Sequence, residues 1–477
     1  MQTVHVVILV LYVLVMIGTG VWFTRRKKVQ TGDDFVFAGR SLPLVVMVGT
    51  LIATWVGSGS IIGGASFAFS YGPLAAIVYN LGAPAGMVVL FFLARRIRAS
   101  EAYTVPQILE NRFGIPVRLV ASAITLLAYV GITSYQFTGG GRIIALVTPL
   151  SPGEGAIVCA AVITFLALGG GLKSVAWSDF LSAVVIIASL IVALPIILGE
   201  VGGFSGWWEG LPDHAHTMSG GLTGVQLLGY FLPTFLLIIS DQNMYQRLGA
   251  AKNPAEARKS MVGMFLASLL ITVPIVLLAT SSSVLQPNLT PDDAVLSLGS
   301  EGFLPTVLGG LLLAGALAFI ITTGSSFLLS VAGNVVYDGF QRFSTETLDD
   351  RRRIRIHRVT ILVIAAVAYV LGTYFPTVLV IQMYSYTVYG VALVPALFAG
   401  FFWRRATTAG VLTSMALGVV VTIGWEQLGR PDEVNSVIIS LPVAVLALVL
   451  VSLVTRPART LPVASAAATP TTESKEN

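Results

Sequence analysis

The feature that most constrains this chain is a series of long apolar runs separated by short polar segments. A helix needs roughly 20 mostly apolar residues to cross the hydrocarbon core of a bilayer. Only 11% of the 477 residues are charged, whereas soluble domains average about 25%. The pattern therefore predicts an all-α polytopic membrane protein with about 13 transmembrane helices. The spans are expected at residues 4–23, 43–71, 73–98, 117–148, 153–169, 174–199, 222–247, 256–281, 303–338, 356–373, 377–402, 406–425 and 435–455.

Lysine and arginine are distributed unevenly between the two sets of connecting segments. Thirteen spans place the termini on opposite sides, and the short cytoplasmic loops of membrane proteins carry an excess of Lys and Arg. With the N-terminus outside, all 28 Lys and Arg residues except Arg142 and Arg430 belong to the inner side. We therefore expect a multi-pass protein of the plasma (inner) membrane with a cytoplasmic C-terminus. The net charge of +5 then reflects topology and the lipid bilayer rather than a nucleic-acid partner, and no obligatory protein partner is evident.

Two of the expected spans contain features that interrupt a helix. Residues 53–64 hold four glycines and two serines in the middle of a span, and Pro233 removes a helical hydrogen bond from the span at 222–247. Unwound backbone is tolerated in a membrane only where it lines a cavity or binds an ion; close helix packing through small residues is the alternative. The two interrupted spans begin about 180 residues apart, which suggests two inverted five-helix halves with a substrate site between them.

These features divide the chain into six segments with different expected roles. The order is an extra N-terminal transmembrane helix with a basic inner loop (1–42), the first five-helix repeat (43–199), an outer loop (200–221), the second five-helix repeat (222–402), two additional transmembrane helices (403–455) and a disordered cytoplasmic tail (456–477).

Polar residues inside the spans mark the candidate site, because ionisable groups are costly at membrane depth. Asp179 lies six residues past Lys173, or about 9 Å inward at 1.5 Å per residue; it either contacts a cation or proton or caps another helix. The segment Thr322-Thr323-Gly324-Ser325-Ser326 places four hydroxyls near the middle of one span. Hydroxyls and freed carbonyls suit a hard monovalent cation, whereas the alternative is hydrogen bonding within and between helices.

Two further ionisable residues lie near span ends, and each has two interpretations. Asp241, near the inner end of its span, is either functional or an interfacial acid that is solvated or paired with Arg247. Arg142, within two turns of an outer end, either extends to the interface or contacts an anionic solute.

Four separated patterns, covering roughly residues 33–425, resemble the sodium/solute symporter family, whose members share the broken-helix, inverted-repeat fold of the leucine transporter. The patterns are Phe35-Val36-Phe37-Ala38-Gly39-Arg40-Ser41-Leu42; Gly170-Gly171 followed by Val175-Ala176-Trp177-Ser178-Asp179; Asp241-Gln242 with Gln246-Arg247 and Ala250-Ala251-Lys252; and Pro395 with Gly400-Phe401-Phe402-Trp403-Arg404 and Thr407-Thr408-Ala409-Gly410.

The resemblance implies three sets of site residues. A sodium site would comprise the carbonyls of Ala53, Val56 and Phe319 and the hydroxyls of Thr322 and Thr323. A second sodium, held by some members, would lie near Asp179, with Ser325 and Ser326 contributing. The substrate cavity would map near Trp55, Ser58, Ser60, Tyr79, Asn80, Thr234 and Gln382. Ser60 and Asn80 stand where the family's sugar transporters have glutamine and glutamate, which argues against a sugar as the solute.

The residues and the resemblance together predict a sodium-coupled secondary active symporter, not an enzyme. It would import a small polar organic solute by alternating access, either neutral, zwitterionic or bearing one carboxylate. Proton coupling through Asp179 is the alternative within transport. A transporter-like sensor would need a signalling or ligand-binding domain after residue 455, and an enzyme would need metal ligands or a nucleophile–base pair at membrane depth.

Overall fold

A break in the first core helix is present where the glycine- and serine-rich segment predicts it. Helix α3 (Leu44–Trp55) ends where Val56 adopts an extended conformation, with φ −81° and ψ 119°. The chain resumes as the π-helical turn η2 (Gly59–Gly63) and continues as α4 (Gly64–Ser100). The carbonyls at the end of α3 are therefore left without helical partners.

The computed structural model describes residues 2–25, 40, 42–100, 102, 104–169, 172–340, 350–375 and 377–456. Every regular element within these residues is helical, which confirms the all-α expectation. Most of the basic loop expected after the first span, the Phe35–Ala38 pattern, Gly170-Gly171 and the tail from residue 457 lie outside the described residues. The other elements are α1 (Gln2–Arg25), α5 (Val105–Phe113), α6 (Ile115–Val147), α7 (Pro152–Gly169), α8 (Leu172–Glu200), α9 (Gly203–Gly210), η3 (Asp213–His216), α10 (Gly224–Ser240), α11 (Gln242–Gly249), α12 (Pro254–Leu285), η4 (Pro291–Asp293), α13 (Ala294–Ser300), α14 (Thr306–Asn334), η5 (Val335–Phe340), α16 (Asp350–Gly372), α17 (Val378–Phe402), α18 (Thr408–Gln427), η6 (Pro431–Glu433) and α19 (Val437–Val454).

Many of these helices match the dimensions of a membrane span. Among the described residues, 10 helices are long and apolar enough to cross a bilayer. Three shorter apolar helices cover Thr3–Gly18, Leu44–Trp55 and Pro152–Leu168. The expected polytopic helical protein is therefore confirmed, while the count of thirteen spans stays a prediction.

The predicted spans 43–71 and 73–98 meet at a sharp bend inside α4. The bend is at Gly72, whose φ of +84° is unfavourable for a residue with a Cβ. A Cβ there would also lie 2.4 Å from the Cβ of Ala215 in η3. Glycine is therefore required for both the backbone conformation and the close approach of η3.

The second break is present, but the prediction that Pro233 causes it was wrong. Helix α10 continues through Pro233 to Ser240, and the interruption follows at Asp241, with φ −61° and ψ 112°. The Asp241 carboxylate accepts a hydrogen bond of 2.9 Å from the backbone N–H of Asn243. A carboxylate N-cap starts a new helix, here α11, whereas a proline within a membrane helix removes one hydrogen bond that the surroundings can compensate.

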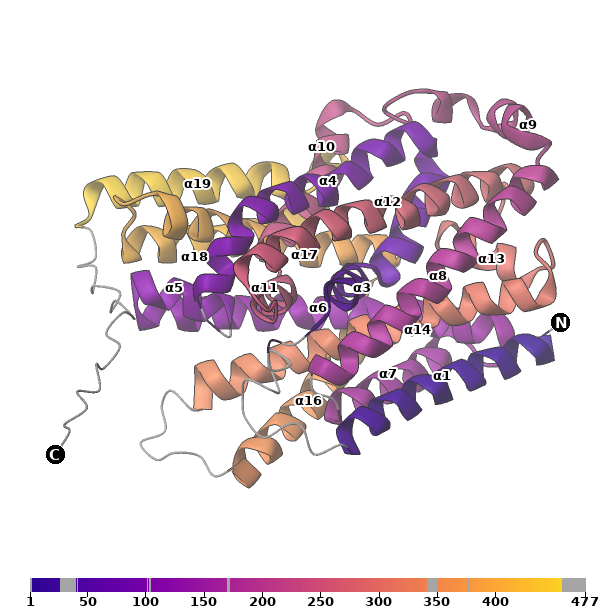
Figure 1. Cartoon of the computed structure of the whole chain (residues 1–477). Coiled ribbons are helices and arrows are strands. Elements are labelled where there is room, and N and C mark those ends of the chain that lie inside the picture. Colours follow the sequence, from indigo (N-terminus) through magenta and orange to yellow (C-terminus); the bar gives the residue numbers. More distant parts are fainter. Residues whose placement is uncertain are drawn as a thin grey trace.

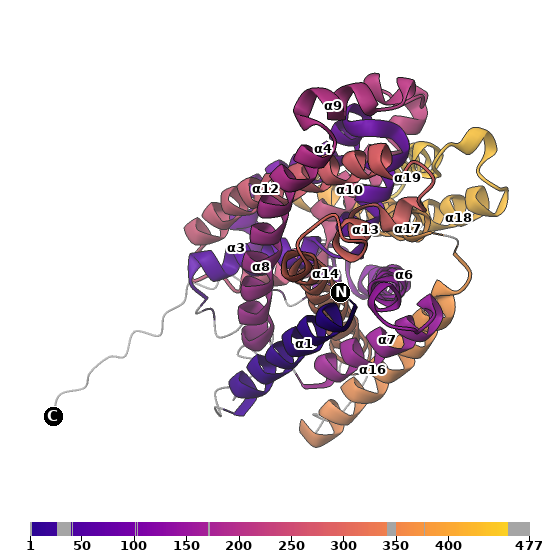
Figure 2. The same cartoon turned by 90° about the vertical axis from the view of Figure 1, so that its right-hand side faces the viewer.

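Helices α14 and α17 form the centre of the bundle. In the most apolar 18-residue stretch of each helix, 83% of the stretch is buried in α14 and 78% in α17, against 22% in α16. Helix α6 packs against both of them. Figures 1 and 2 show α1, α7 and α16 on one side of the bundle and α18 and α19 on the opposite side. Helices α9 and α13 lie at the end where α1 begins, and α5 lies at the end where α19 finishes.

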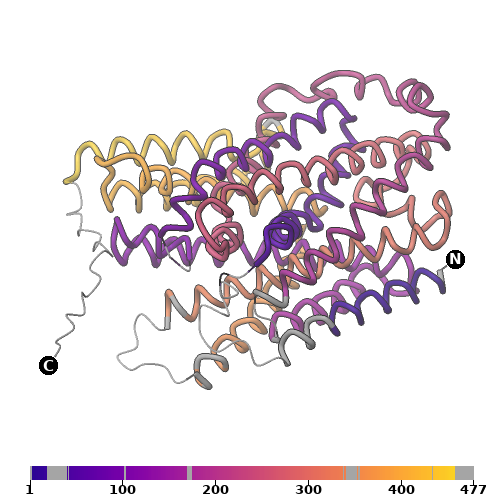
Figure 3. The backbone as a smooth tube through the Cα atoms, in the orientation of Figure 1, coloured from indigo at the N-terminus to yellow at the C-terminus, as the bar shows by residue number. Residues whose placement is uncertain are grey.

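The short helices beside the two breaks meet in the interior. In Figure 3, α3 and α11 are seen nearly end-on, among long helices that run across the view. The two contact each other, and both contact α14. Thr50 and Arg247, which are 197 residues apart in sequence, are thereby brought together.

Candidate functional site

The break in the first core helix lies directly against the hydroxyl-rich part of α14. The Thr323 hydroxyl lies 2.7 Å from the carbonyl oxygen of Ala53 and 2.8 Å from that of Val56. All three residues are almost completely buried. The hydroxyl thus faces the two carbonyls that unwinding releases, and three of the five oxygen atoms expected at the sodium site converge.

The other two members of the expected sodium site are one turn apart on the same helix. The Thr322 hydroxyl donates a hydrogen bond of 3.2 Å to the carbonyl of Phe319. Thr322 directly precedes Thr323 on α14, and both side chains are buried. All of the oxygens are neutral, and such donors suit a monovalent cation.

Asp179 lies on α8 and is paired with residues of two other helices. Its Oδ2 atom accepts a hydrogen bond of 2.6 Å from the Thr50 hydroxyl and lies 3.5 Å from a guanidinium nitrogen of Arg247. Arg247 and Asp179 are each only 1% exposed. The sequence offered no local basic partner for Asp179 and placed Arg247 beside Asp241 instead; this tertiary pair was missed.

Arg247 also lies at the expected second sodium site, which would comprise Asp179, Ser325 and Ser326. The same nitrogen of Arg247 that faces Asp179, Nη2, donates a hydrogen bond of 3.1 Å to the Ser326 hydroxyl. The Ser325 hydroxyl instead donates to the carbonyl of Thr322 in its own helix, at 3.0 Å. The structure therefore connects Asp179 to Ser326 through a guanidinium, and it does not bring Ser325 into contact with them.

Asp241 is buried, so its interpretation as a solvated interfacial acid was wrong, whereas the expected interaction with Arg247 is present as an electrostatic one. The side chain is 1% exposed, and its Oδ1 accepts a hydrogen bond of 2.6 Å from the Tyr129 hydroxyl as well as the one from Asn243. Asp241 therefore ties the second break to α6 at Tyr129.

Gln382 of α17 covers the other face of the broken segment. A Cβ on Gly63 would lie 2.2 Å from Gln382 Oε1, and one on Gly59 would lie 2.9 Å from its Cδ, so a larger residue at either position would displace the Gln382 side chain. The Gln382 amide donates a hydrogen bond of 3.2 Å to the Tyr79 hydroxyl. Two residues expected at the substrate cavity, Tyr79 and Gln382, are thus in direct contact beside the break.

Gln136 of α6 is a site residue that the sequence analysis missed. Its Oε1 accepts a hydrogen bond of 2.9 Å from the backbone N–H of Ser58, and the side chain is 1% exposed. At the preceding residue of α6, the hydroxyls of Tyr135 and Tyr386 are 3.1 Å apart. An uncharged amide in an otherwise apolar span was the available signal, and it was passed over in favour of ionisable residues.

Two buried polar atoms beside the break remain without a hydrogen-bond partner among the described residues. They are the Ser58 hydroxyl and Oε1 of Gln382. Buried polar atoms are normally paired. These atoms, on the unwound segment and on α17, are therefore the clearest candidates for contact with a polar solute.

The remaining residues of the expected cavity are less closely grouped. Trp55 is partly buried at the end of α3, and its carbonyl lies 3.4 Å from the Ser60 hydroxyl. Thr234 donates to the carbonyl of Phe231 in its own helix, at 2.8 Å. Asn80 likewise donates to Ala76, at 2.8 Å. For Thr234 and Asn80 a role in the cavity stays a prediction.

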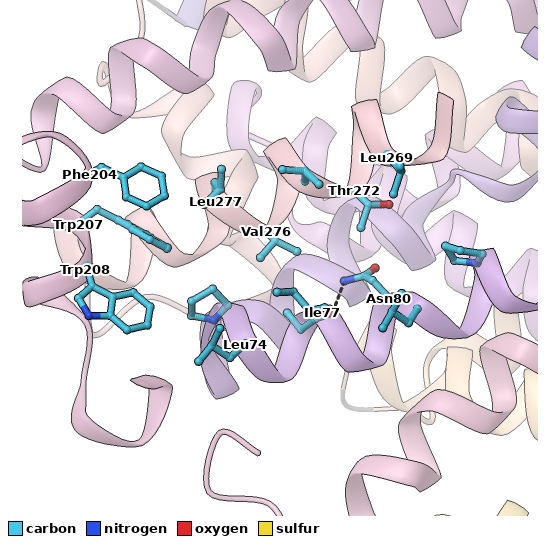
Figure 4. Close-up of a pocket in the computed structure, with 15 residues that line it drawn as sticks. Leu74, Ile77, Asn80, Phe204, Trp207, Trp208, Leu269, Thr272, Val276 and Leu277 are labelled. Atoms are coloured by element: carbon cyan, nitrogen blue, oxygen red, sulfur yellow. Dashed lines mark hydrogen bonds between the residues drawn. The ribbon is translucent and has the colours of Figure 1, made fainter. Parts of the chain in front are cut away.

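Asn80 also lines an apolar groove of about 440 Å³ between α4 and α12. Figure 4 shows Asn80 beside Ile77, Thr272 and Val276, with Trp207 and Trp208 of α9 at the other end of the groove. Half-exposed side chains such as Ile77, Leu81 and Val273 contribute to its walls. The groove is thus a feature of the apolar outer surface, and neither broken helix lines it.

Arg142 is paired with acids rather than extended alone to the interface. Its guanidinium lies 3.3 Å from Asp292 and 3.3 Å from Asp293. Asp292 also accepts a hydrogen bond of 3.2 Å from the backbone N–H of Val378. Burial raises the pKa of Asp293, although the charge of Arg142 opposes this shift. Arg142 therefore anchors the η4 segment to α6 and to the start of α17.

Replacing Arg142 with glutamine should change the apparent solute affinity less than threefold, because none of its described contacts is a residue at the break. The same change should lower the thermal stability of the protein, since Asp292 and Asp293 would lose their cation. Uptake kinetics and unfolding midpoints for the purified variant check both statements. Loss of solute binding in Arg142→Gln would place the solute near η4 instead.

Known proteins provide an independent comparison. The model of the sodium:solute symporter family matches residues 35–418. The chain is 25% identical over 467 residues to a sodium/glucose cotransporter of Vibrio parahaemolyticus, with 88% of this chain and 84% of that protein covered. It is 25% identical to the high-affinity proline transporter PutP of Bacillus subtilis, with 90% and 94% covered. A sodium/pantothenate symporter of Escherichia coli is 23% identical, with 92% and 95% covered.

Solved structures share the fold at low sequence identity. A Na+-coupled sialic acid symporter in a substrate-bound outward-open state superposes with a TM-score of 0.83 at 17% identity, covering 96% of this chain and 99% of that one. The nucleobase-cation-symport-1 family transporter MHP1 gives 0.60 at 16% identity, with 89% and 96% covered. The bundle therefore has the fold of the leucine-transporter type, and the chain belongs to the sodium:solute symporter family.

Proposed function

We propose that this symporter imports a small polar organic solute by alternating access, driven by sodium bound at the break between α3 and η2. The sodium ligands would be the carbonyls of Ala53, Val56 and Phe319 and the hydroxyls of Thr322 and Thr323. The observation that carries the proposal is the Thr323 hydroxyl, which lies within 2.8 Å of both carbonyls released by unwinding.

A cation at this position would join two structural units that otherwise meet through few polar contacts. The Ala53 and Val56 carbonyls belong to the broken helix, and the threonines belong to the continuous helix α14. Sodium bound between them stabilises one relative position of the two helices, and its release removes that restraint. Coupling follows because a ligand shifts a conformational equilibrium by its difference in affinity for the two states.

The solute would bind beside the sodium, between η2 and α17. The polar groups there are the Gln136 and Gln382 amides, the Ser58 hydroxyl and the Tyr79 and Tyr386 phenols, and none of them carries a charge at neutral pH. Amides both donate and accept hydrogen bonds, which suits a neutral or zwitterionic solute. The charge of the sodium would balance a single carboxylate on the solute.

The pairing of Asp179 with Arg247 bears on the alternative of proton coupling. The Arg247 guanidinium and the Thr50 hydroxyl both contact Oδ2 of Asp179. Sodium coupling is favoured instead by the neutral oxygens that converge at Thr323 and by the family.

We further propose thirteen spans in two inverted halves, 43–199 and 222–402, with the N-terminus outside. The breaks at Val56 and Asp241 support the halves, since each lies in the first helix of its half. Helix α1 begins at one end of the bundle and α19 finishes at the other, as an odd number of spans requires.

The proposal can be tested by thermal stabilisation of the purified protein. The midpoint of unfolding would be measured against a library of amino acids, vitamins, nucleobases, quaternary amines, organic acids and sugars, each with sodium and with an equal concentration of potassium. We expect one class of small polar compounds to raise the midpoint of unfolding, and only when sodium is present. Equal stabilisation in potassium, or stabilisation by large apolar compounds, would contradict the proposal.

Replacing Gln382 with alanine should raise the solute concentration for half-maximal uptake about tenfold. The amide can make two hydrogen bonds to the solute, each worth about 1 kcal/mol, and 1.4 kcal/mol corresponds to a factor of ten. Thr387→Val on the same helix is the matched control, because Thr387 contacts Met383 and Asn435 instead. An unchanged half-maximal concentration in Gln382→Ala would remove Gln382 from the solute site.

A further inference from the structure

Arg247 is the buried cation of this site, and its contacts come from several helices. It is the largest side chain among the fully buried ones. Its Nε lies 3.0 Å from the Thr50 hydroxyl on α3, and its Nη2 contacts both Asp179 on α8 and Ser326 on α14. A guanidinium keeps its charge in proteins. A fixed positive charge therefore stands among the oxygen atoms at which a second sodium is expected.

Arg247 is the cation that faces the buried carboxylates beside the two breaks. Asp179 and Asp241 are both buried, and both interact electrostatically with Arg247. The contacts of Asp179 are Thr50, Thr322 and Arg247, and those of Asp241 include Tyr129 and Asn243. Among these contacts only Arg247 carries a charge, so the guanidinium already supplies a positive charge at the place where a second sodium would bind.

We propose that Arg247 acts as a tethered cation in the place of a second sodium, so that this symporter binds one sodium ion per transport cycle. The inference rests on the proposed sodium site at Ala53, Val56, Phe319, Thr322 and Thr323. A second sodium at Asp179 would lie beside the guanidinium, and like charges repel strongly in a medium of low dielectric constant.

Asp179 retains one atom that could bind a cation if Arg247 were absent. Its Oδ1 has no hydrogen-bond partner among the described residues. Loss of the guanidinium would also release the Ser326 hydroxyl and leave Oδ2 with the Thr50 hydroxyl. Oδ1, Oδ2 and the Ser326 hydroxyl would then form an anionic site of the kind that binds sodium. Arg247 therefore sets the number of sodium ions, and the rest of the site would accept another.

The test is a direct count of bound sodium. Radioactive 22Na+ would be titrated onto the purified full chain in lipid nanodiscs, with potassium as the background salt. We expect one sodium per wild-type chain and a Hill coefficient of one. Arg247→Gln should bind two, and the double variant Asp179→Asn/Arg247→Gln, which removes both charges, should bind one.

The possible outcomes separate this inference from the proposed function. Two sodium ions on the wild type, with one lost in Asp179→Asn, would overturn the inference and leave sodium coupling intact. No sodium on the wild type would instead overturn the proposed sodium site. A count of one in folded Arg247→Gln would show that Arg247 does not exclude the second ion. If Arg247→Gln does not fold, the wild-type count decides: one supports the inference and two overturns it.

Discussion

Replacing Thr322 and Thr323 together with valine is expected to raise the sodium concentration for half-maximal uptake at least tenfold. Valine keeps the branched shape of threonine and removes the hydroxyl. The Thr323 hydroxyl is the group that approaches the Ala53 and Val56 carbonyls. If each lost oxygen ligand costs about 1 kcal/mol, the loss of two exceeds the 1.4 kcal/mol that corresponds to a factor of ten.

The measurement is solute uptake into proteoliposomes across a range of sodium concentrations, at equal protein content. Thr422→Val is the control, because Thr422 is also fully buried but donates to the carbonyl of Gly418 within α18. The control should show the wild-type sodium dependence. An unaltered sodium dependence in the Thr322/Thr323 double variant would show that the sodium site is elsewhere.

The second large effect is expected at the pair of Arg247 and Asp179. In sodium-free buffer, replacing Arg247 alone with glutamine should lower the free energy of unfolding by about 3–5 kcal/mol, because it leaves a buried carboxylate without its cation. Replacing both residues, as Asp179→Asn/Arg247→Gln, should cost clearly less, since no uncompensated charge remains. The physical reason is that breaking a buried pair is more costly than replacing it.

Thermal unfolding of the single and double variants in the same detergent tests this prediction. Arg258→Gln is the matched control, because Arg258 is only partly buried and lies 4.1 Å above the ring of Phe91. Its midpoint should change little. If the two single variants and the double variant follow simple additivity, Asp179 and Arg247 are not energetically coupled.

The sequence was sufficient for features that depend on residues close together in the chain. The apolar runs predicted an all-helical membrane protein, because the need for about 20 apolar residues per span is local. The glycines and serines of residues 53–64 predicted the first break, since unwinding depends on the residues that unwind. The family resemblance then predicted that Thr322 and Thr323 lie near Ala53 and Val56, and in the structure Thr323 contacts both carbonyls.

Only the tertiary structure decided which distant residues are partners. The sequence placed Arg247 beside Asp241, six residues away, but helix packing directs its guanidinium to Asp179 and Ser326. The second break lies at Asp241 rather than Pro233 because the Asp241 carboxylate accepts a hydrogen bond from the backbone N–H of Asn243 and so caps a new helix. The place of Gln136 in the site was found only from its hydrogen bond with the backbone N–H of Ser58. Helical periodicity gives the face on which a residue lies, whereas the orientation and depth of packed helices determine what that face meets.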